Sequence, residues 1–372
     1  MWPRLMANKW FGLRPKPGGD KFNSDMSETD DEPEPLEKSP RLRRGQSETL
    51  WTQCVDNYSY RIFVGTWNVG GKTPEETLDL DEWLNTKESS DIYVIGFQEI
   101  VPLKAGKVFG AENSRSADKW DTQIRKALNK NGAAAENASI LRSATVPTSA
   151  EGEILLDSGH CTNNLDGIDM LKLDDINKWR QKRRYIRIAS KQMVGIFITI
   201  WVKSEVRCHI RDLKVSSVGC GIMGCLGNKG SVSISMSLHE TSFCFVCTHL
   251  ASGEKESDGI RRNSDVAEIL KRTCFPRDST LDLPQTILGH DRIIWFGDLN
   301  YRLTIAESEA KSLIHQKDWN TLQLTDQLKL EKNPGGLFDG WQEGHIDFSP
   351  TYKYVANSDE YCGTQEKRRV PA

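Results

Sequence analysis

Four apolar, strand-like runs of this sequence end on polar residues that could act together at one site. The four ends read Thr66-Trp67-Asn68, Gln98-Glu99, Thr248-His249 and Gly297-Asp298-Leu299-Asn300. Active sites collect at strand ends because a sheet fixes positions while the loops leave room for a substrate. Two carboxylates, amides and an imidazole suit metal-assisted hydrolysis of a phosphate ester, since Mg²⁺ prefers one or two carboxylates, several waters and the phosphate oxygens of its substrate.

Each of these residues also has a plainer explanation when it is taken alone. Glu99 is typical of a solvated or capping residue, and His249 is typical of a near-core histidine whose ring is already hydrogen-bonded. Asp298 and Asn68 are common in turns. The prediction of a catalytic centre therefore rests on the whole set. It requires that Asn68, Glu99, His249, Asp298 and Asn300 meet around a hydrated cation.

The most specific signal in the chain is Trp295-Phe296-Gly297-Asp298-Leu299-Asn300-Tyr301-Arg302. It matches the W-x-G-D-x-N-[FY]-R pattern of inositol polyphosphate 5-phosphatases, which belong to the exonuclease–endonuclease–phosphatase superfamily. The resemblance includes Gly65-Thr66-Trp67-Asn68-Val69, Phe97-Gln98-Glu99, Gly227-Asn228-Lys229-Gly230, Thr248-His249-Leu250 and Thr351-Tyr352-Lys353-Tyr354, so it covers the chain from about Arg61 onward. The plant type of this family is further resembled by Trp2-Pro3-Arg4, Lys9-Trp10 and Arg43-Arg44-x-x-Ser47-Glu48-Thr49-Leu50.

The resemblance implies a catalytic role for each residue of the set. Glu99 would hold Mg²⁺, with Asn68 in or near the metal's shell, and the metal would stabilise charge on the leaving oxygen. Asp298 would orient or deprotonate the attacking water. Asn300 and His249 would donate hydrogen bonds to phosphate oxygens, which gain charge as the transition state forms.

Substrate recognition is implied for a second group of residues. The resemblance places a basic and phenolic cluster around the phosphate next to the scissile one, and Asn228 and Lys229 beside the site. The members of that cluster are Tyr352, Lys353, Lys367 and Arg369, although residues 367–369 taken alone also fit a solvated basic run. The implied substrates are inositol polyphosphates such as inositol 1,4,5-trisphosphate, and phosphoinositide lipids such as phosphatidylinositol 4,5-bisphosphate at the membrane surface.

The elements that must position these residues predict an α+β fold. Apolar runs rich in β-branched or aromatic residues span 60–66, 92–97, 194–202, 231–238, 243–247 and 292–296. Helical spacing appears at 258–272 and 304–314, and the long neighbouring runs suggest antiparallel pairing. We therefore expect a two-sheet β-sandwich flanked by helices, which the resemblance identifies as DNase I-like. Residues 132–169 are polar and irregular and suggest a surface insertion.

The composition leads us to expect a cytoplasmic protein, and the phosphoinositide substrates implied by the resemblance would place it peripherally at membranes. It has 372 residues and a net charge of -3, and no apolar run approaches the roughly 20 residues of a membrane-spanning helix. The N-terminus lacks the apolar region of a secretory signal. Residues 1–55 are predicted to be a mostly disordered extension, because an acidic stretch with two prolines meets a basic one there, and residues 56–372 are predicted to be the catalytic domain.

Two local patterns call for a negative prediction. Gly219-x-Gly221-x-x-Gly224 fits the dinucleotide-binding fingerprint, but a strand-like run follows where that fingerprint must open a helix. Cys244 and Cys247 have zinc-like spacing but lie within one strand-like run, so their side chains should point to opposite faces. We expect no nucleotide loop and mostly buried free thiols.

Two alternatives to the phosphatase prediction stay open. A Mg²⁺-dependent nuclease of the same superfamily would use the same carboxylates, amide and imidazole, although the basic cluster and a net charge of -3 argue against nucleic acid. A non-catalytic form that binds phosphoinositides or a protein is the second alternative. It is motivated by the end of the sequence at Ala372, inside a stretch that matches the start of the family's P-A-W-C-D-R-I-L motif. The resemblance thus leads us to expect that the last strands and a later Ser-Asp-His segment are missing, and that this chain has little or no activity.

Overall fold

The computed structural model describes residues 57–102, 112–140, 184–221, 224, 226–277, 284–355, 358–362 and 370. Its helices and strands all belong to the unit that runs from Arg61 to Ala372. The predicted extension, residues 1–55, lies outside the described residues, as do Lys367 and Arg369. None of the helices in the described ranges is long and apolar enough to span a membrane.

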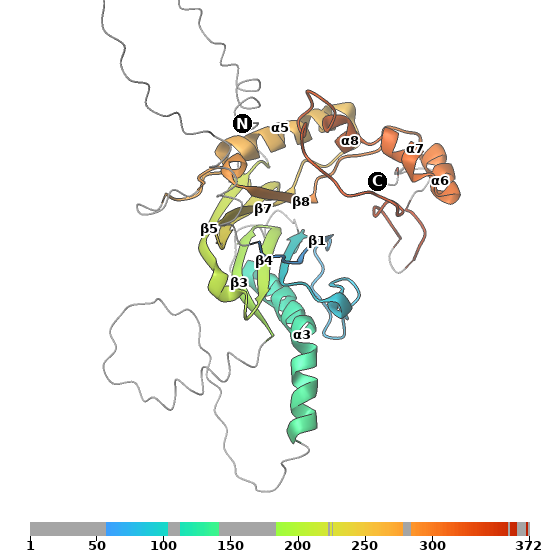
Figure 1. The fold of residues 1–372 in the computed structure, drawn as a ribbon. Helices are drawn as coiled ribbons and strands as arrows, with labels where there is room; N and C mark the ends of the chain where they lie inside the picture. The colour runs from blue at the N-terminus through green and yellow to red at the C-terminus, as the bar shows by residue number, and fades with distance from the viewer. Residues whose placement is uncertain are drawn as a thin grey trace, which may run out of the picture. The chain divides into compact units, whose positions relative to one another are not determined.

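The described strands form two four-stranded sheets (Figure 1). The first has the strand order β1-β2-β4-β3, and its members are β1 (Ile62–Asn68), β2 (Ile92–Gln98), β3 (Tyr185–Met193) and β4 (Ile196–Lys203). The second has the order β5-β6-β7-β8, and its members are β5 (Ile210–Gly219), β6 (Gly230–Leu238), β7 (Thr241–His249) and β8 (Arg292–Asp298). The antiparallel pairing of β5 with β6 confirms the pairing predicted for the long neighbouring runs.

The two parallel strand pairs are the ones that carry the predicted site. β1 runs parallel to β2, with Asn68 opposite Gln98, and β7 runs parallel to β8, with His249 opposite Asp298. β2 contacts both β7 and β8, and β1 contacts β8, so the two sheets pack face to face. The carboxyl ends of all four strands therefore meet at one end of the sandwich.

Strand β2 shows how the two faces of a sheet are used. All seven of its residues are buried, and alternate side chains face opposite layers. Tyr93, Ile95 and Phe97 belong to the cluster on the outer face of the first sheet. Gly96 faces the other sheet so closely that a Cβ there would lie 2.5 Å from the Sγ of Cys247. The sheets thus touch through small residues directly below the site.

A helix covers the outer face of each sheet (Figure 1). Helix α3 (Glu112–Ile140) packs Trp120 and Ile124 into the cluster that contains Phe97. Helix α5 (Glu256–Arg272) packs Val266 and Ile269 against Val246 of the second sheet. The remaining described helices are η1 (Thr86–Glu88), η2 (Arg207–His209), η4 (Ile287–Gly289), α6 (Glu307–Gln316), α7 (Trp319–Leu324) and α8 (Gln327–Glu331). This arrangement confirms the predicted α+β sandwich.

Three local predictions have clear outcomes. The surface insertion was wrong at its start, because residues 132–140 continue helix α3, as the good helix-former alanine at positions 133–135 favours; residues 141–169 are outside the described ranges. Gly219 ends β5, and strand β6 is the element that comes next in the described part of the chain, so the dinucleotide loop is rightly rejected. Cys244 packs towards α5 and Cys247 towards the other sheet, and burial raises the pKa of each thiol to about 12.

Candidate active site

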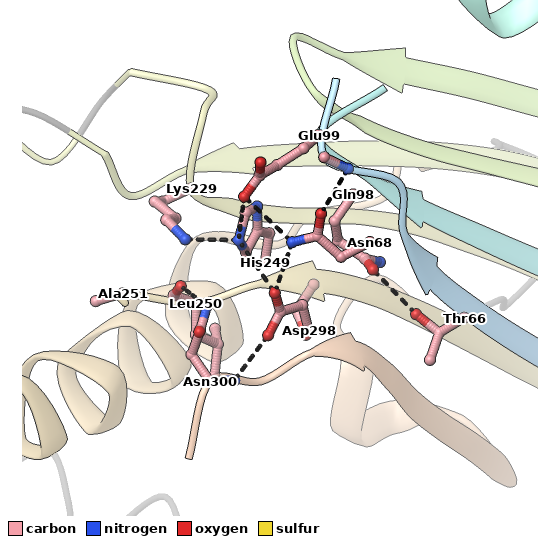
Figure 2. A network of polar contacts seen from close by, with 12 residues as sticks. Thr66, Asn68, Gln98, Glu99, Lys229, His249, Leu250, Ala251, Asp298 and Asn300 are labelled. Carbon is pink, nitrogen blue, oxygen red and sulfur yellow. Dashed lines mark hydrogen bonds and ion pairs between the residues drawn. The ribbon is translucent and has the colours of Figure 1, made fainter. Parts of the chain in front are cut away.

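The ends of β1, β2, β7 and β8 bring the five predicted catalytic side chains into one polar network (Figure 2). Asn68 links the two carboxylates in it. Its Nδ2 donates to Oε1 of Glu99 at 3.1 Å and to Oδ2 of Asp298 at 2.9 Å, while its Oδ1 accepts from the backbone N–H of Gly70 at 3.0 Å. One amide from the first sheet therefore joins a carboxylate of the same sheet to one of the second.

Unusual backbone conformations occur at or next to the residues of this network. Glu99 follows β2 with a φ of 55°, and Asn300 follows β8 with a φ of 58°. Both lie in the left-handed region, which residues other than glycine rarely adopt. Gly297, just before Asp298, has a φ of 125°, and a Cβ there would lie 2.1 Å from the carbonyl oxygen of Thr248. Such strain persists where the surroundings fix it, and it collects at functional sites.

Asn300 connects the loop after β8 to the loop after β7 by a hydrogen bond. Its backbone N–H donates to Oδ1 of Asp298 at 3.2 Å, and its Nδ2 donates to the carbonyl of Leu250 at 2.9 Å. Its Oδ1 accepts from the guanidinium of Arg302 at 2.8 Å, and that guanidinium lies 4.6 Å from the ring centre of Tyr352. An amide nitrogen carries two hydrogens, so one bond to Leu250 leaves a second N–H of Asn300 for a ligand.

His249 is only 2% exposed and sits between the carboxylates and a lysine. Its Nε2 lies 3.4 Å from Oδ2 of Asp298, 3.9 Å from Oε1 of Glu99 and 2.6 Å from Nζ of Lys229. The Nδ1 is buried and has no hydrogen-bond partner within the described part of the chain. The short contact with Nζ fits an ammonium that donates to a neutral imidazole, with Nε2 as the acceptor.

Burial governs the charge of this pair. Burial lowers the pKa of Lys229 to about 8, against the opposing attraction of Asp298 and Glu99. Burial, and then the nearby Lys229 ammonium, holds the pKa of His249 well below its ordinary value. His249 is therefore neutral at neutral pH, so the positive charge facing the two carboxylates comes from Lys229.

A cavity of about 1540 Å³ opens over this network. Its wall includes all five catalytic candidates, and it also includes Tyr352 and Lys353, for which the resemblance implies substrate contacts. Asn228 is not among the described residues of this wall; its Oδ1 is buried, and a Cβ on Gly221 would approach it to 2.0 Å. Lys229 joins the network through the contact of its Nζ with Nε2 of His249. Lys367 and Arg369 fall outside the described residues, so their predicted role is neither supported nor opposed by geometry.

The donor set suits a hard divalent cation with an open coordination shell. Within the described ranges, no group of three or more His, Cys, Asp or Glu side chains could hold a metal by itself. Glu99 and Asp298 nevertheless both direct an oxygen to the same Asn68 amide, next to a large cavity. Mg²⁺ is held in this way, by one or two carboxylates with waters and substrate phosphate filling the other positions. The residues present therefore fit that ion.

Comparisons with known proteins cover this whole network. The sequence model of the endonuclease/exonuclease/phosphatase family 2 matches residues 65–149 and 168–372. Type I inositol polyphosphate 5-phosphatase 8 of Arabidopsis thaliana is 46% identical over 392 residues, which span 100% of this chain and 78% of that protein. Type IV inositol polyphosphate 5-phosphatase 9 of the same plant is 45% identical over 379 residues, which span 100% of this chain and 82% of that protein.

A solved structure gives the same result for the fold. The inositol polyphosphate 5-phosphatase domain of SPsynaptojanin, in complex with inositol (1,4)-bisphosphate and calcium ion, matches with a TM-score of 0.64 and 26% sequence identity. The match covers 88% of this chain and 78% of that chain. The residues that meet at the four strand ends all lie inside the matched family ranges.

Proposed function

Because this chain belongs to the inositol polyphosphate 5-phosphatases of the endonuclease/exonuclease/phosphatase family 2, we propose that it hydrolyses the 5-phosphate of inositol polyphosphates and phosphoinositides with Mg²⁺. The observation that carries the proposal is the bridge made by Asn68, which joins Glu99 and Asp298 across the two sheets at the floor of the cavity. Inositol 1,4,5-trisphosphate and phosphatidylinositol 4,5-bisphosphate are the substrates proposed.

Asp298 is the residue proposed to orient or deprotonate the attacking water. Each of its carboxylate oxygens accepts one hydrogen bond, Oδ2 from Asn68 and Oδ1 from the backbone of Asn300. These two bonds fix the plane of the carboxylate before substrate arrives. A general base must be held within hydrogen-bond reach of the proton that it takes, and this geometry supports such a role.

Glu99 and Asn68 are the residues proposed to hold Mg²⁺. The ion, when bound, polarises the scissile phosphate and stabilises charge on the leaving oxygen. Lys229 and the second N–H of Asn300 supply further positive and hydrogen-bonding groups beside the phosphate, and His249 holds the Lys229 ammonium in place. Charge that grows on phosphate oxygens is stabilised best by donors already in position.

The cavity wall supports the proposed substrate class. Tyr352 and Lys353 line it and would meet a phosphate next to the scissile one, together with Lys367 and Arg369 if those residues reach the same wall. Trp67 and Phe348 also line the cavity and are exposed, Phe348 to 56%. Exposed aromatic side chains on a cavity wall suit a substrate in a membrane surface, which supports phosphoinositides as partners and a peripheral association with membranes. We propose that the protein is otherwise cytoplasmic.

The direct test is phosphate release from inositol 1,4,5-trisphosphate by the purified chain, with Mg²⁺ or with a chelator. Because the five catalytic candidates meet at one cavity, we expect measurable release in place of the little or no activity predicted from the end of the sequence. That release should require the metal, leave inositol 1,4-bisphosphate and fall by roughly 10²–10⁴-fold in Asp298→Asn. Binding of the trisphosphate without release would favour the non-catalytic alternative. Mg²⁺-dependent nicking of plasmid DNA in place of phosphate release would favour the nuclease alternative.

A further inference from the structure

Arg262 of helix α5 is a fully buried cation, with 0% exposure, that lies next to the site without touching it. Its guanidinium donates to the carbonyl of Ala251 at 3.2 Å, to the carbonyl of Gly253 at 3.1 Å and to Oε1 of Gln327 at 2.8 Å. These three acceptors are neutral oxygens, and its Nε is buried with no partner in the described ranges. Burying a charge is costly unless it is compensated, and here these hydrogen bonds act together with the attraction of Asp258 and Asp265 and with the Tyr301 ring centre at 5.6 Å.

The first arm of Arg262 fixes the loop that follows His249. Ala251 is held at both of its backbone polar groups, because its carbonyl accepts from Arg262 and its N–H donates to Asp265 at 2.8 Å. The preceding residue, Leu250, is held from the other side, since its N–H donates to the carbonyl of Asp298 at 3.0 Å. Figure 2 shows Leu250 and Ala251 beside Asn300, directly below His249. The backbone N–H and carbonyl groups of Leu250 and Ala251 are therefore all hydrogen-bonded, which resists movement of the loop at this point.

The second arm of Arg262 reaches the segment that follows Asp298. Oε1 of Gln327 accepts from Arg262 and also from the backbone N–H of Arg302 at 3.0 Å. The Arg302 side chain in turn donates to Oδ1 of Asn300, whose Nδ2 donates to the carbonyl of Leu250. The two sets of hydrogen bonds thus form one closed network that includes both Asn300 and Arg262.

We propose that Arg262 is a positioning residue that, with Gln327 as its relay, holds the loops after β7 and β8 in register, so that Asn300 faces the scissile phosphate and His249 keeps the Lys229 ammonium beside it. The proposal rests on the proposed phosphatase function. It predicts that loss of either partner slows the chemical step far more than it weakens substrate binding. A displacement of about 1 Å at a catalytic group costs on the order of 100-fold in rate.

Two isosteric variants at position 327 test the relay with little risk to folding. Gln327→Glu keeps an oxygen acceptor for Arg262 and for the backbone of Arg302, whereas Gln327→Leu removes it. We expect Gln327→Glu to keep kcat within about threefold of the parent chain, and Gln327→Leu and Arg262→Met each to lower kcat by roughly 10- to 100-fold with KM nearly unchanged. Arg261→Met is the matched control, since the Arg261 side chain is 74% exposed and pairs only with its helix neighbour Asp258 among the ion pairs of the described residues.

Amide hydrogen exchange across residues 249–254, after β7, and residues 299–304, after β8, supplies a readout that does not depend on turnover. Exchange should accelerate in Arg262→Met and Gln327→Leu, and stay unchanged in Gln327→Glu and Arg261→Met. Parent-like kcat in Gln327→Leu, or parent-like exchange in Arg262→Met, would overturn the proposal. If the parent chain releases no phosphate, the proposed function fails by itself, and the exchange comparison still decides whether Arg262 fixes the two loops. A fall in Tm with neither effect would make Arg262 a structural residue only.

Discussion

At the scale of single residues, the site depends on groups whose ordinary charge is altered by burial. Lys229 and His249 share one short contact, and the pKa of each is lowered, first by the loss of water around it. The attraction of Asp298 and Glu99 opposes both shifts. In this geometry the imidazole is placed to accept from an ammonium, whereas the family resemblance implies that it donates to phosphate.

Replacing Lys229 by methionine should raise the pKa of His249. The ammonium repels a proton on the imidazole, whereas Asp298 and Glu99 attract it, so in Lys229→Met burial still lowers the pKa but the only charges left to act on it are these two attractive ones. The measurement is an NMR titration of the His249 ring in metal-free buffer. Lys271→Met, at an exposed ion pair on α5, should leave the titration unchanged. A His249 pKa that stays where it is, or falls, in Lys229→Met would contradict this account.

His290 should make the protein less stable in mild acid. Its Nδ1 lies 3.0 Å from the carbonyl of Thr286 and its Nε2 lies 2.8 Å from Oγ of Ser235, so the neutral ring fills both positions, and burial lowers its pKa below the ordinary value. As pH falls below about 6.5, the unfolded chain gains a proton before the folded chain does, so the free energy of unfolding decreases; above that pH the contribution is constant.

Urea unfolding between pH 7.5 and 5 measures this effect. The free energy of unfolding of His290→Gln should depend less on pH than that of the parent, by up to about 1.4 kcal/mol per pH unit. His249 is present in both proteins, so the difference isolates His290. Equal slopes in the parent and His290→Gln would show that His290 does not titrate as inferred.

At the scale of elements, the catalytic groups depend on how strands β7 and β8 end. Gly297 combines a φ of 125° with a close approach to the backbone of Thr248, whereas Gly335 has a φ of 86° in open space and Gly344 has neither constraint. These three glycines separate steric contact from backbone strain. They also show why a glycine precedes the aspartate in this motif.

Alanine at the three positions should therefore destabilise the protein in a fixed order. Gly344→Ala should change the free energy of unfolding by no more than about 0.5 kcal/mol. Gly335→Ala should cost about 1–3 kcal/mol from strain alone. Gly297→Ala should cost more than Gly335→Ala, because backbone atoms of Thr248 must move as well, and it should be the only one of the three to reduce activity strongly. Equal losses at 297 and 335 would mean that contact with Thr248 is unimportant.

The sequence predicted the strands that carry the site better than it predicted the elements around them. β2 and β8 are short apolar runs bounded by polar residues, so their ends could be placed within one or two residues. Strand β3 was missed because its polar residues Arg187, Lys191 and Gln192 obscure the alternation. Helix α3 was missed because its buried face uses small residues such as Ala117 and Ala127 between the larger ones.

The candidate site shows the same division. Residues at strand ends could be predicted because a motif and a family resemblance marked them. Arg262 carried no such signal, since an arginine among polar residues of a helix is ordinarily a surface residue. The contact between Lys229 and His249 depends on the register of β6 against β7, which places Gly230 opposite His249, and a single sequence does not supply that register.

At the scale of the whole molecule, the site exists only while the two sheets keep their spacing. Asn68 and Glu99 come from the first sheet, whereas His249 and Asp298 come from the second. The sheets meet below them at Gly96, where a Cβ would lie 2.5 Å from Sγ of Cys247 and 2.7 Å from the ring of Phe296. A tightly packed interior transmits such a clash because it has no free volume to absorb it.

Gly96→Ala should therefore act as a wedge, costing about 1–3 kcal/mol of unfolding free energy and lowering activity although it touches no catalytic group. Removing the obstacle should reverse part of the loss. In Gly96→Ala/Cys247→Ala the new methyl occupies space left by Sγ, so both stability and phosphate release should exceed those expected from adding the two single effects. Cys244→Ala, on the opposite face of β7, is the matched control and should give no rescue in combination with Gly96→Ala. Two substitutions that act at the same contact must be coupled, so their effects cannot simply add. Additive losses in the Gly96→Ala/Cys247→Ala protein would therefore show that the contact between the sheets does not set the geometry of the site.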